Sequence, residues 1–286
     1  EGAVEVYRQI ITQAPQNVQA HWELATCLIE QENYDDALKV LLKGYELQPN
    51  NLKTIKKLGD LYRRKGDRNS ALEYYQKELA IAPQDLIANL DVAIELQEFN
   101  KFDSARERIA YALKHHPHNF HALMQMGRLE QKRHRLDVAL EYFQQTAENY
   151  PQKLEPQFAT IDLAFRRGSI PQAKERLEIL LEKHPQEYRV LMQAGFLARK
   201  LGERGRAKEW FELAQQQALN LSEATRAKQR AIEESRELGD LERALESIEE
   251  IIQQSPEDVH SLAIKGSILQ KMLDFSTAEA VYRDIL

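Results

Sequence analysis

The segment Ala71-Leu-Glu-Tyr-Tyr-Gln-Lys-Glu-Leu-Ala-Ile-Ala-Pro83 decides the fold, because its spacing returns along the whole sequence. Alanine recurs in steps of 34 residues at positions 3, 37, 71, 105, 139, 173 and 207, and again at 244 and 278. Proline closes the same frame at positions 15, 49, 83, 117, 151 and 185, and again at 256. A repeat of this length is typical of a solenoid, in which every unit stacks only on its neighbours.

The unit 52–85 predicts a pair of helices. Apolar residues recur in it at three- or four-residue spacing in two blocks, which indicates two amphipathic helices. The first block is Ile55, Leu58, Leu61 and Tyr62, and the second is Ala71, Leu72, Tyr75 and Leu79. Gly66 tolerates the backbone of a tight turn between the blocks, and Pro83 ends the second helix. The predicted unit is therefore an αα-hairpin with a short loop.

Small residues set how closely the two helices of a unit approach. We expect Gly59 and Ala71 to face the seam between the helices, where small side chains let the backbones come close. Tyr75 would fill the space beside this contact. The slot of Gly59 holds Ile161 and Ile232 in the units that start at residues 154 and 225. Those two hairpins should pack more openly.

The spacing of these residues resembles the tetratricopeptide repeat, whose pattern places W, L, G, Y, A, F, A and P at fixed positions of a 34-residue unit. One repeat matches it with Leu58, Gly59, Tyr62, Ala71, Tyr75 and Pro83. A second matches with Met126, Gly127, Ala139, Phe143 and Pro151, and a third with Leu24, Ala25, Ala37, Leu41 and Pro49. The resemblance covers essentially the whole chain. It implies an all-α fold, an α-solenoid whose antiparallel helix pairs form a right-handed superhelix, and a function in binding other proteins.

The frame divides residues 1–286 into a single array of about eight units and a partial N-terminal one. The units are 1–17 (partial), 18–51, 52–85, 86–119, 120–153, 154–187, 188–221, 225–258 and 259–286 (truncated). Because the chain starts inside a unit and stops before a closing proline, we expect it to be a piece of a longer chain. The join at 215–225 is irregular, since Leu219 replaces the expected proline and the next unit starts three residues late. This predicts a lengthened helix or a longer loop, with Leu219 and Leu221 covering the seam.

The net charge, the cysteine count and the lengths of the apolar runs argue against several classes of function. The formal net charge of −6 argues against generic nucleic-acid binding, which needs a basic face. Cys27 is the one cysteine, so the chain has neither a disulfide nor a cysteine-based zinc site of its own. This favours a reducing compartment, the cytoplasm, and leaves the periplasm open. No apolar run is long enough to cross a bilayer, so direct membrane insertion is not expected.

No residue pattern favours catalysis, a cofactor or a metal, so we do not expect an enzyme. Four histidines surround the predicted turn at Pro117: His115, His116, His118 and His121. Polar residues are expected at such a turn, and a metal site would need several imidazoles fixed around one ion. Cys27 has no partner residue and is typical of a small packed side chain. The glycines fall in seam or turn slots, so they do not indicate a phosphate-binding loop.

In the family that the chain resembles, first helices line the concave side, and positions 2, 5, 6, 9, 12 and 13 of each unit point inward. In the unit 52–85 these positions hold one carboxylate, Asp60, and five cations: Lys53, Lys56, Lys57, Arg63 and Arg64. Between residues 86 and 221 these positions carry a strip of large apolar residues, namely Ile87, Leu90, Ile94, Met124, Phe158, Phe165, Met192 and Phe196, with Arg128 among them. Trp22 adds apolar surface before the cations. Two plainer explanations stay open, in which the apolar side chains pack between neighbouring first helices and the cations form only a solvated helix face.

The sequence therefore predicts a scaffold that binds another protein, as a peptide or an amphipathic helix, in the concave groove. Apolar anchors of the partner would meet the strip from Leu90 to Phe196, and an acidic segment would meet the cations. Position 9 of the first four full units holds no asparagine, which disfavours the two-carboxylate clamp of the family. One alternative is a structural spacer or assembly platform in a bacterial envelope or polysaccharide-export machine, which would self-associate through its exposed terminal repeats. Another is the docking arm of an enzyme elsewhere in a longer chain.

Overall fold

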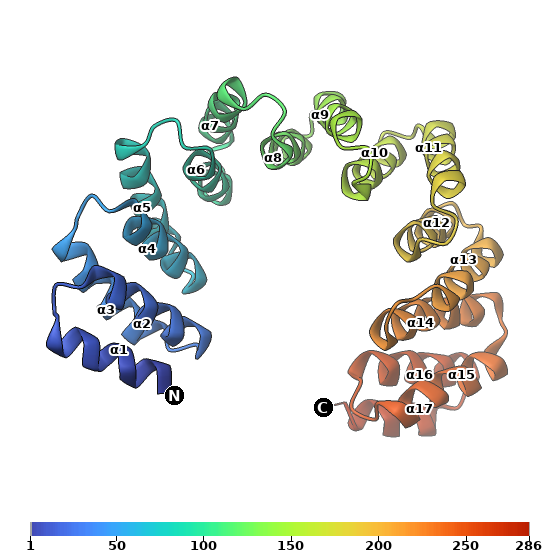
Figure 1. Ribbon diagram of the computed structural model, residues 1–286. Coiled ribbons are helices and arrows are strands. Elements are labelled where there is room, and N and C mark those ends of the chain that lie inside the picture. Colours follow the sequence, from blue (N-terminus) through green and yellow to red (C-terminus); the bar gives the residue numbers. More distant parts are fainter. Residues whose placement is uncertain (1, 286) are drawn as a thin grey trace. The chain divides into compact units, whose positions relative to one another are not determined.

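The computed structural model describes residues 2–285, which form seventeen α-helices and no β-strand (Figure 1). The chain divides into two compact units, Glu1–Pro156 and Gln157–Leu286. The first unit holds α1 (Gly2–Gln13), α2 (Val18–Glu30), α3 (Tyr34–Leu47), α4 (Leu52–Arg64), α5 (Arg68–Ile81), α6 (Leu86–Glu98), α7 (Phe102–His115), α8 (Phe120–Lys132), α9 (Leu136–Asn149) and the start of α10 (Leu154–Arg166). The second holds the rest of α10, then α11 (Ile170–Lys183), α12 (Tyr188–Lys200), α13 (Arg204–Gln216), α14 (Leu221–Leu238), α15 (Leu241–Gln254), α16 (Val259–Lys271) and α17 (Phe275–Arg283). The fold is an all-α solenoid of helix pairs.

The first helices of the pairs begin where the sequence frame places them. The helices α2, α4, α6, α8, α10, α12 and α16 start at residues 18, 52, 86, 120, 154, 188 and 259. Side-chain caps explain several of these starts. The Asn51 side chain accepts a hydrogen bond from the Thr54 backbone N–H at 3.1 Å, and Asp85 accepts one from Ala88 at 2.8 Å. Each cap satisfies an N–H group that the first helical turn leaves without a partner.

The turn inside each hairpin places one residue in the left-handed region of backbone space. These residues are Gly66, Gly168, Gly202 and Gly239, and, without glycine, Glu32, Asn100, His134 and Leu273. Glycine adopts a positive φ without a steric penalty, whereas a side chain there strains the backbone. The predicted role of Gly66 is therefore confirmed, and the same geometry recurs with other residue types.

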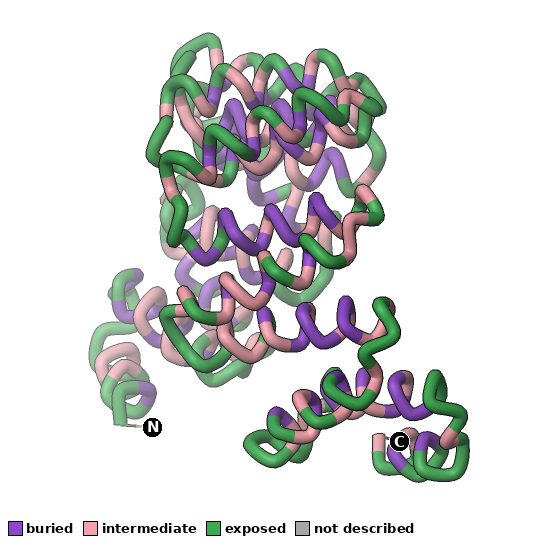
Figure 2. The backbone as a smooth tube through the Cα atoms, turned by 90° about the vertical axis from the view of Figure 1, so that its right-hand side faces the viewer, coloured by how far each residue is buried: buried purple, intermediate pink, exposed green. Residues whose placement is uncertain are grey.

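A glycine of the first helix lies against an aromatic ring of the second in four hairpins. The pairs are Gly59 with Tyr75, Gly127 with Phe143, Gly195 with Phe211 and Gly266 with Tyr282. A Cβ atom added to Gly59 or to Gly127 would lie 2.5 Å from the ring, closer than real Cβ atoms come. Figure 2 shows the buried positions recurring along the helices, with exposed positions at the turns. The predicted close seam is confirmed.

The hairpin of α14 and α15 lacks this glycine. Ile232 occupies the slot and packs with Ile248 in a shared core cluster. The backbones of α14 and α15 lie apart over more of their length than those of α4 and α5 or of α12 and α13. The prediction of a more open hairpin is confirmed for Ile232, and it remains a prediction for Ile161.

The irregular join resolves as a lengthened helix. Helix α14 starts at Leu221 and extends over 18 residues, whereas the other first helices of full units have 13. The expectation that Leu219 and Leu221 cover the seam is wrong, because their side chains are 90% and 70% exposed. The extra turn of α14 leaves these leucines outside the helix packing.

Replacing Gly195 by alanine should destabilise the second unit by about 1–3 kcal/mol, because the new methyl group overlaps the Phe211 ring. Gly205 on α13 provides the matched control, since a Cβ there meets no atom within 4 Å. Gly205→Ala should leave stability unchanged or raise it by up to about 1 kcal/mol, because alanine restricts the unfolded chain. Urea unfolding followed by circular dichroism measures both changes. Equal stability of the two variants would contradict the seam assignment.

Candidate functional site

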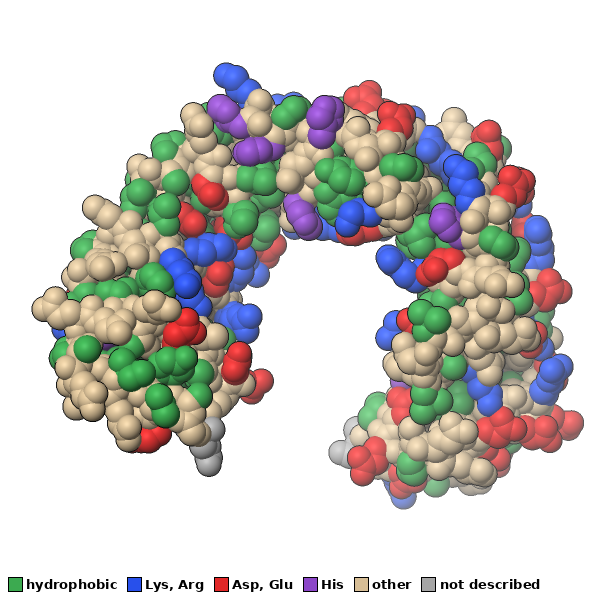
Figure 3. Space-filling view, in the orientation of Figure 1, with side chains coloured by type: hydrophobic (Ala, Val, Ile, Leu, Met, Phe, Trp, Pro, Cys, Tyr) green, Lys and Arg blue, Asp and Glu red, His purple; other side chains and the backbone are tan. Residues whose placement is uncertain are grey.

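The predicted basic residues of the first unit are largely paired inside the protein. Lys56 Nζ lies 2.7 Å from the Asp60 carboxylate and 2.5 Å from that of Asp91. Arg63 contacts Asp91 at 2.9 Å and Glu95 at 2.5 Å. Basic and acidic side chains accordingly interleave on the surface of this unit in Figure 3. Carboxylates of the next first helix, α6, already pair with Lys56 and Arg63, and the expectation that these cations meet an acidic partner stays a prediction.

The remaining basic residues of α4 and the nearby Trp22 have different roles. Lys53 Nζ stands 4.4 Å from the centre of the Trp22 ring, and the indole N–H donates to Thr54 Oγ1 at 2.7 Å. Lys57 Nζ donates to Thr26 Oγ1 at 2.8 Å. Within residues 2–285, Arg64 makes no ion pair. Trp22 and Lys53 remain partly accessible, but they belong to the contact between α2 and α4.

Each of the two compact units contains an ion cluster in which two arginines of one repeat hold a buried glutamate of the next repeat. Glu95 on α6 is fully buried and is held by Arg63 on α4 and by Arg68 on α5, the latter at 3.0 Å. Glu234 on α14 is 1% exposed and is held in the same way by Arg199 on α12 and Arg204 on α13. The two clusters use the same positions of the sequence repeat. The glutamate is at position 10 of its repeat, and the arginines are at positions 12 and 17 of the preceding repeat. A buried carboxylate requires such partners because burial alone disfavours its charge.

The predicted apolar strip is only partly accessible. Leu90, Met124 and Met192 are 9%, 2% and 6% exposed, so these residues pack inside the stack and offer no surface to a partner. This corrects their expected role. Ile94 is partly exposed, and Arg128 forms an ion pair with Glu155 at 2.5 Å.

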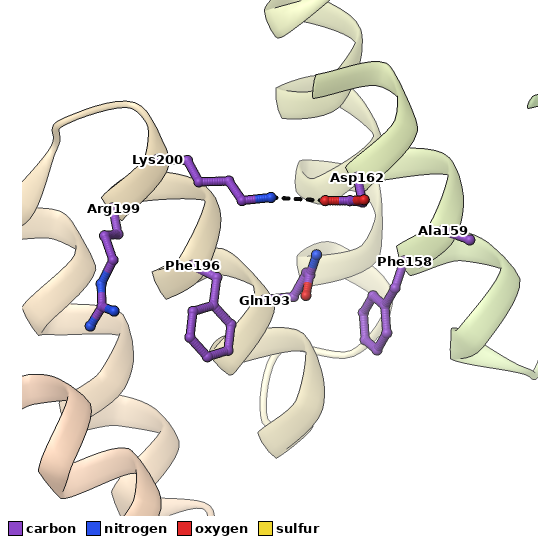
Figure 4. Close-up of a pocket in the computed structure, with 7 residues that line it drawn as sticks. All are labelled: Phe158, Ala159, Asp162, Gln193, Phe196, Arg199 and Lys200. Atoms are coloured by element: carbon purple, nitrogen blue, oxygen red, sulfur yellow. Dashed lines mark hydrogen bonds and ion pairs between the residues drawn. The ribbon is translucent and has the colours of Figure 1, made fainter. Parts of the chain in front are cut away.

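The three phenylalanines of the strip remain partly exposed, and two of them line one depression. Phe158 on α10 and Phe196 on α12 face an open hollow of about 440 Å³. Gln193 on α12 points between the two helices, beside the Phe158 ring (Figure 4). Ala159, Asp162, Arg199 and Lys200 complete the lining. The sequence analysis identified both rings as site residues and missed these polar neighbours.

An ion pair spans the depression from one helix to the other. Lys200 Nζ donates to the Asp162 carboxylate at 2.8 Å and stands 5.0 Å from the centre of the Phe165 ring (Figure 4). Burial alone would raise the pKa of Asp162, but Lys200 and Arg166 lower it below its ordinary value. The carboxylate therefore stays charged. The sequence signal for this pair is the presence of opposite charges at inward positions of two successive repeats. Inspection of one helix at a time does not detect it.

Arginines stand over the faces of the two rings. The Arg189 guanidinium lies 5.5 Å from the centre of the Phe158 ring, and that of Arg230 lies 5.9 Å from the Phe196 ring. Arg230 also pairs with Glu233 at 2.9 Å, whereas Arg189 has no carboxylate within ion-pair distance in the described part of the chain. The depression thus joins two aromatic surfaces to an unpaired cation.

The first unit buries one unusual carboxyl. Glu78 on α5 is 7% exposed, and its Oε2 atom has no hydrogen-bond partner among residues 2–285. Burial raises the pKa of Glu78 from 4.5 to about 7, Lys56 opposes the rise, and Asp85, Asp91 and Asp60 add to it. The carboxyl thus changes charge near neutral pH beneath the ion pairs of α4 and α6.

The other chemistry considered from the sequence finds no site in the described residues. Across residues 2–285, no group of three or more His, Cys, Asp or Glu side chains is placed to hold a metal ion. Cys27 is a free, partly buried thiol. The His115 ring lies 4.8 Å from the Tyr111 ring, as a surface contact. In the same span, no helix has both the length and the apolar character that crossing a membrane requires.

Comparison with protein families gives one consistent match. Family models described as tetratricopeptide repeat match residues 1–61, 54–88, 90–153 and 158–220. The BBSome complex member BBS4 of Bos taurus is 27% identical over 144 residues, which make up 49% of this chain and 27% of that protein. The chain thus spans about a quarter of the length of this relative.

Two solved structures share the fold. A tetratricopeptide repeat protein from Parabacteroides merdae ATCC 43184 has a TM-score of 0.63 at 16% identity, covering 89% of this chain and 99% of that chain. The human IFIT1 dimer with m7Gppp-AAAA has a TM-score of 0.56 at 14% identity, covering 99% of this chain and 66% of that chain. At these identities the likeness concerns the fold alone.

The stability of the first unit should fall as pH rises from about 4.5 through about 7, because folded Glu78 binds its proton more tightly than unfolded Glu78 does. Glu78→Gln removes this dependence, so the variant should exceed the parent chain by about 2 kcal/mol at pH 8 and match it near pH 5. Urea unfolding at both pH values measures the difference. Glu73→Gln, on the exposed side of the same helix, is the control. Parallel pH profiles of the parent and Glu78→Gln chains would refute the assignment.

Removing Arg63 should destabilise the first unit by about 2–4 kcal/mol, since Arg63→Met leaves the buried Glu95 with fewer cationic partners. The double variant Arg63→Met/Glu95→Met should recover at least half of this loss, because no buried charge is then left uncompensated. Arg64→Met, which breaks no ion pair, should change stability by less than about 0.5 kcal/mol. Unfolding free energies from urea titrations test all three. A double variant as unstable as the sum of its single variants would argue against the cluster.

Proposed function

This chain belongs to the tetratricopeptide repeat family, whose repeats mediate protein–protein interaction, and on that premise we propose that its α10–α12 depression binds another polypeptide. The bound segment is an extended peptide or an amphipathic helix. It places a large apolar side chain between Phe158 and Phe196. The partial exposure of these two rings in one depression, where Leu90, Met124 and Met192 of the same strip are buried, is the observation that carries the proposal.

Aromatic surface and a free polar group together suit a polypeptide ligand. The two rings provide contact area with little loss of side-chain freedom, because each ring has only two rotatable bonds. The Gln193 amide has no hydrogen-bond partner within residues 2–285, so it is available to a backbone group of the ligand. An apolar anchor beside a hydrogen bond of this kind is a common mode of peptide recognition.

Charge favours an acidic flank on the ligand. Five cations surround the rings, namely Arg166, Arg189, Arg199, Lys200 and Arg230. Three carboxylates face them, from Asp162, Glu233 and Glu234. An aspartate or glutamate next to the apolar anchor would pair with Arg189 and orient the ligand.

The relative's name and the charge of this chain favour a protein partner over a nucleic acid. The name of the bovine relative describes a member of a protein complex. The IFIT1 structure contains an RNA cap oligonucleotide, but here the net charge is −6 and most groove cations are already paired with carboxylates. A phosphate chain would have to compete with those carboxylates for each cation.

Selection of a random peptide library displayed on phage against the purified chain tests the proposal. Selected peptides should share a large apolar residue flanked by Asp or Glu, and isothermal titration should give micromolar affinities. Phe158→Glu should weaken binding of such a peptide at least about tenfold, which corresponds to about 1.4 kcal/mol. Phe275→Glu is the matched control, because Phe275 is 62% exposed on α17 and does not line the depression. Equal losses in the two variants, or none in Phe158→Glu, would reject the depression as the site.

A further inference from the structure

The link between α13 and α14 presents two leucines to solvent. Leu219 is 90% exposed, more than any other large apolar side chain in residues 2–285, and Leu221 is 70% exposed. Leu219 stands in the place where earlier units have a proline, and three extra residues follow before the next frame. Two large apolar side chains exposed in one loop are a candidate interaction surface, whereas single exposed apolar residues are normal on a protein surface.

Hydrogen bonds hold this loop in one conformation. The Asn220 side chain accepts from the Glu223 backbone N–H at 2.9 Å, and the Leu219 backbone N–H donates to Glu223 Oε2 at 3.1 Å. From the neighbouring first helix, the Tyr188 hydroxyl donates to the Glu223 carbonyl oxygen at 3.2 Å. A loop that is already ordered loses little freedom on binding, so its leucines are prepared for a partner.

The same unit of the protein carries a complementary surface. The depression between α10 and α12 offers two aromatic rings and the unpaired Arg189, and the loop offers two leucines and a carboxylate. That carboxylate, Glu223, forms no ion pair with any cation in the described part of the chain. The two surfaces are therefore complementary in chemical type, with apolar side chains and an anion on the loop and apolar rings and a cation at the depression.

We propose that the Leu219–Leu221 loop of one copy of this chain docks into the Phe158–Phe196 depression of a second copy. This inference rests on the proposed function, because it names a second copy as one polypeptide that occupies the site. The contact pairs two different surfaces, so a copy can lose one of them and still use the other. The loop is small compared with a standard interface, so the association is weak, with a dissociation constant on the order of tens of micromolar.

Sedimentation velocity of the purified chain over a wide concentration range tests the contact. The parent chain should form a reversible dimer or short oligomer. The double variant Leu219→Asp/Leu221→Asp and the variant Phe158→Glu should each raise the dissociation constant at least about tenfold. Arg189→Glu, at an exposed position, provides a second depression variant that keeps its fold if Phe158→Glu does not, and it should weaken association several-fold. Circular dichroism confirms that each variant is folded.

Mixing the two kinds of variant decides the pairing of the surfaces. The loop variant keeps an intact depression and the depression variant keeps an intact loop, so an equimolar mixture should recover association that neither shows alone. A monomeric parent chain, or a mixture that stays monomeric, overturns the inference. Association that survives in all variants also overturns it and assigns the contact to other surfaces, such as α1 or α17.

The library-selected peptide separates this inference from the proposed function. A peptide that binds the parent chain and the loop variant equally, while the parent sediments as a monomer, leaves the depression as a peptide site and overturns the docking of the loop. If Phe158→Glu loses peptide binding and the equimolar mixture of loop and depression variants recovers association, both the peptide site and the docking of the loop are supported.

Discussion

The close approach of a glycine on the first helix to an aromatic ring on the second is the contact on which four of the hairpins depend. Tyr75, Phe143 and Phe211 are buried because Gly59, Gly127 and Gly195 leave no side chain in their way. In these hairpins the ring fills the seam and the glycine lets the two backbones come together, so the two residues of each pair depend on each other. Where Ile232 stands in the glycine slot, an aliphatic partner replaces the ring and the helices separate. The repeat of the sequence therefore reflects pairs of residues that match in size across the seam between the two helices of a hairpin.

Charge adds a second layer of matching, between units and not within them. Glu95 and Glu234 are buried carboxylates, and each is compensated only by arginines of the preceding unit. A helix such as α4 looks strongly basic when it is examined alone, but its cations face the carboxylates of α6. The number of cations on one helix face thus reflects the carboxylates on the next helix that they pair with, and it says little about the charge of a ligand.

The sequence predicted the features of the structure that recur in every repeat. It did not predict the burial of individual side chains, which depends on the helices packed beside them. Helix starts at residues 18, 52 and 86 coincide with the first residues of the units that the period predicts. Burial of Met124 and Met192 did not follow, because an unbranched, flexible side chain at an inward position folds into the gap between first helices. The rigid rings of Phe158 and Phe196 stay partly exposed at comparable positions. The exposed leucines at the join were missed because a covering role was assigned to them from hydrophobicity alone.

These features locate where binding energy is available. Cations of the first unit that hold carboxylates would have to exchange one anion for another, so an acidic ligand would gain little from them. In the second unit, Lys200 and Asp162 likewise pair with each other. Within the described residues, the groups at the depression without such a partner are two aromatic faces, the Gln193 amide and Arg189. Affinity at this site must then come mainly from burial of apolar surface, with one charge to set direction. A partner that carries a leucine or aromatic side chain beside a single carboxylate fits this distribution better than a strongly acidic one.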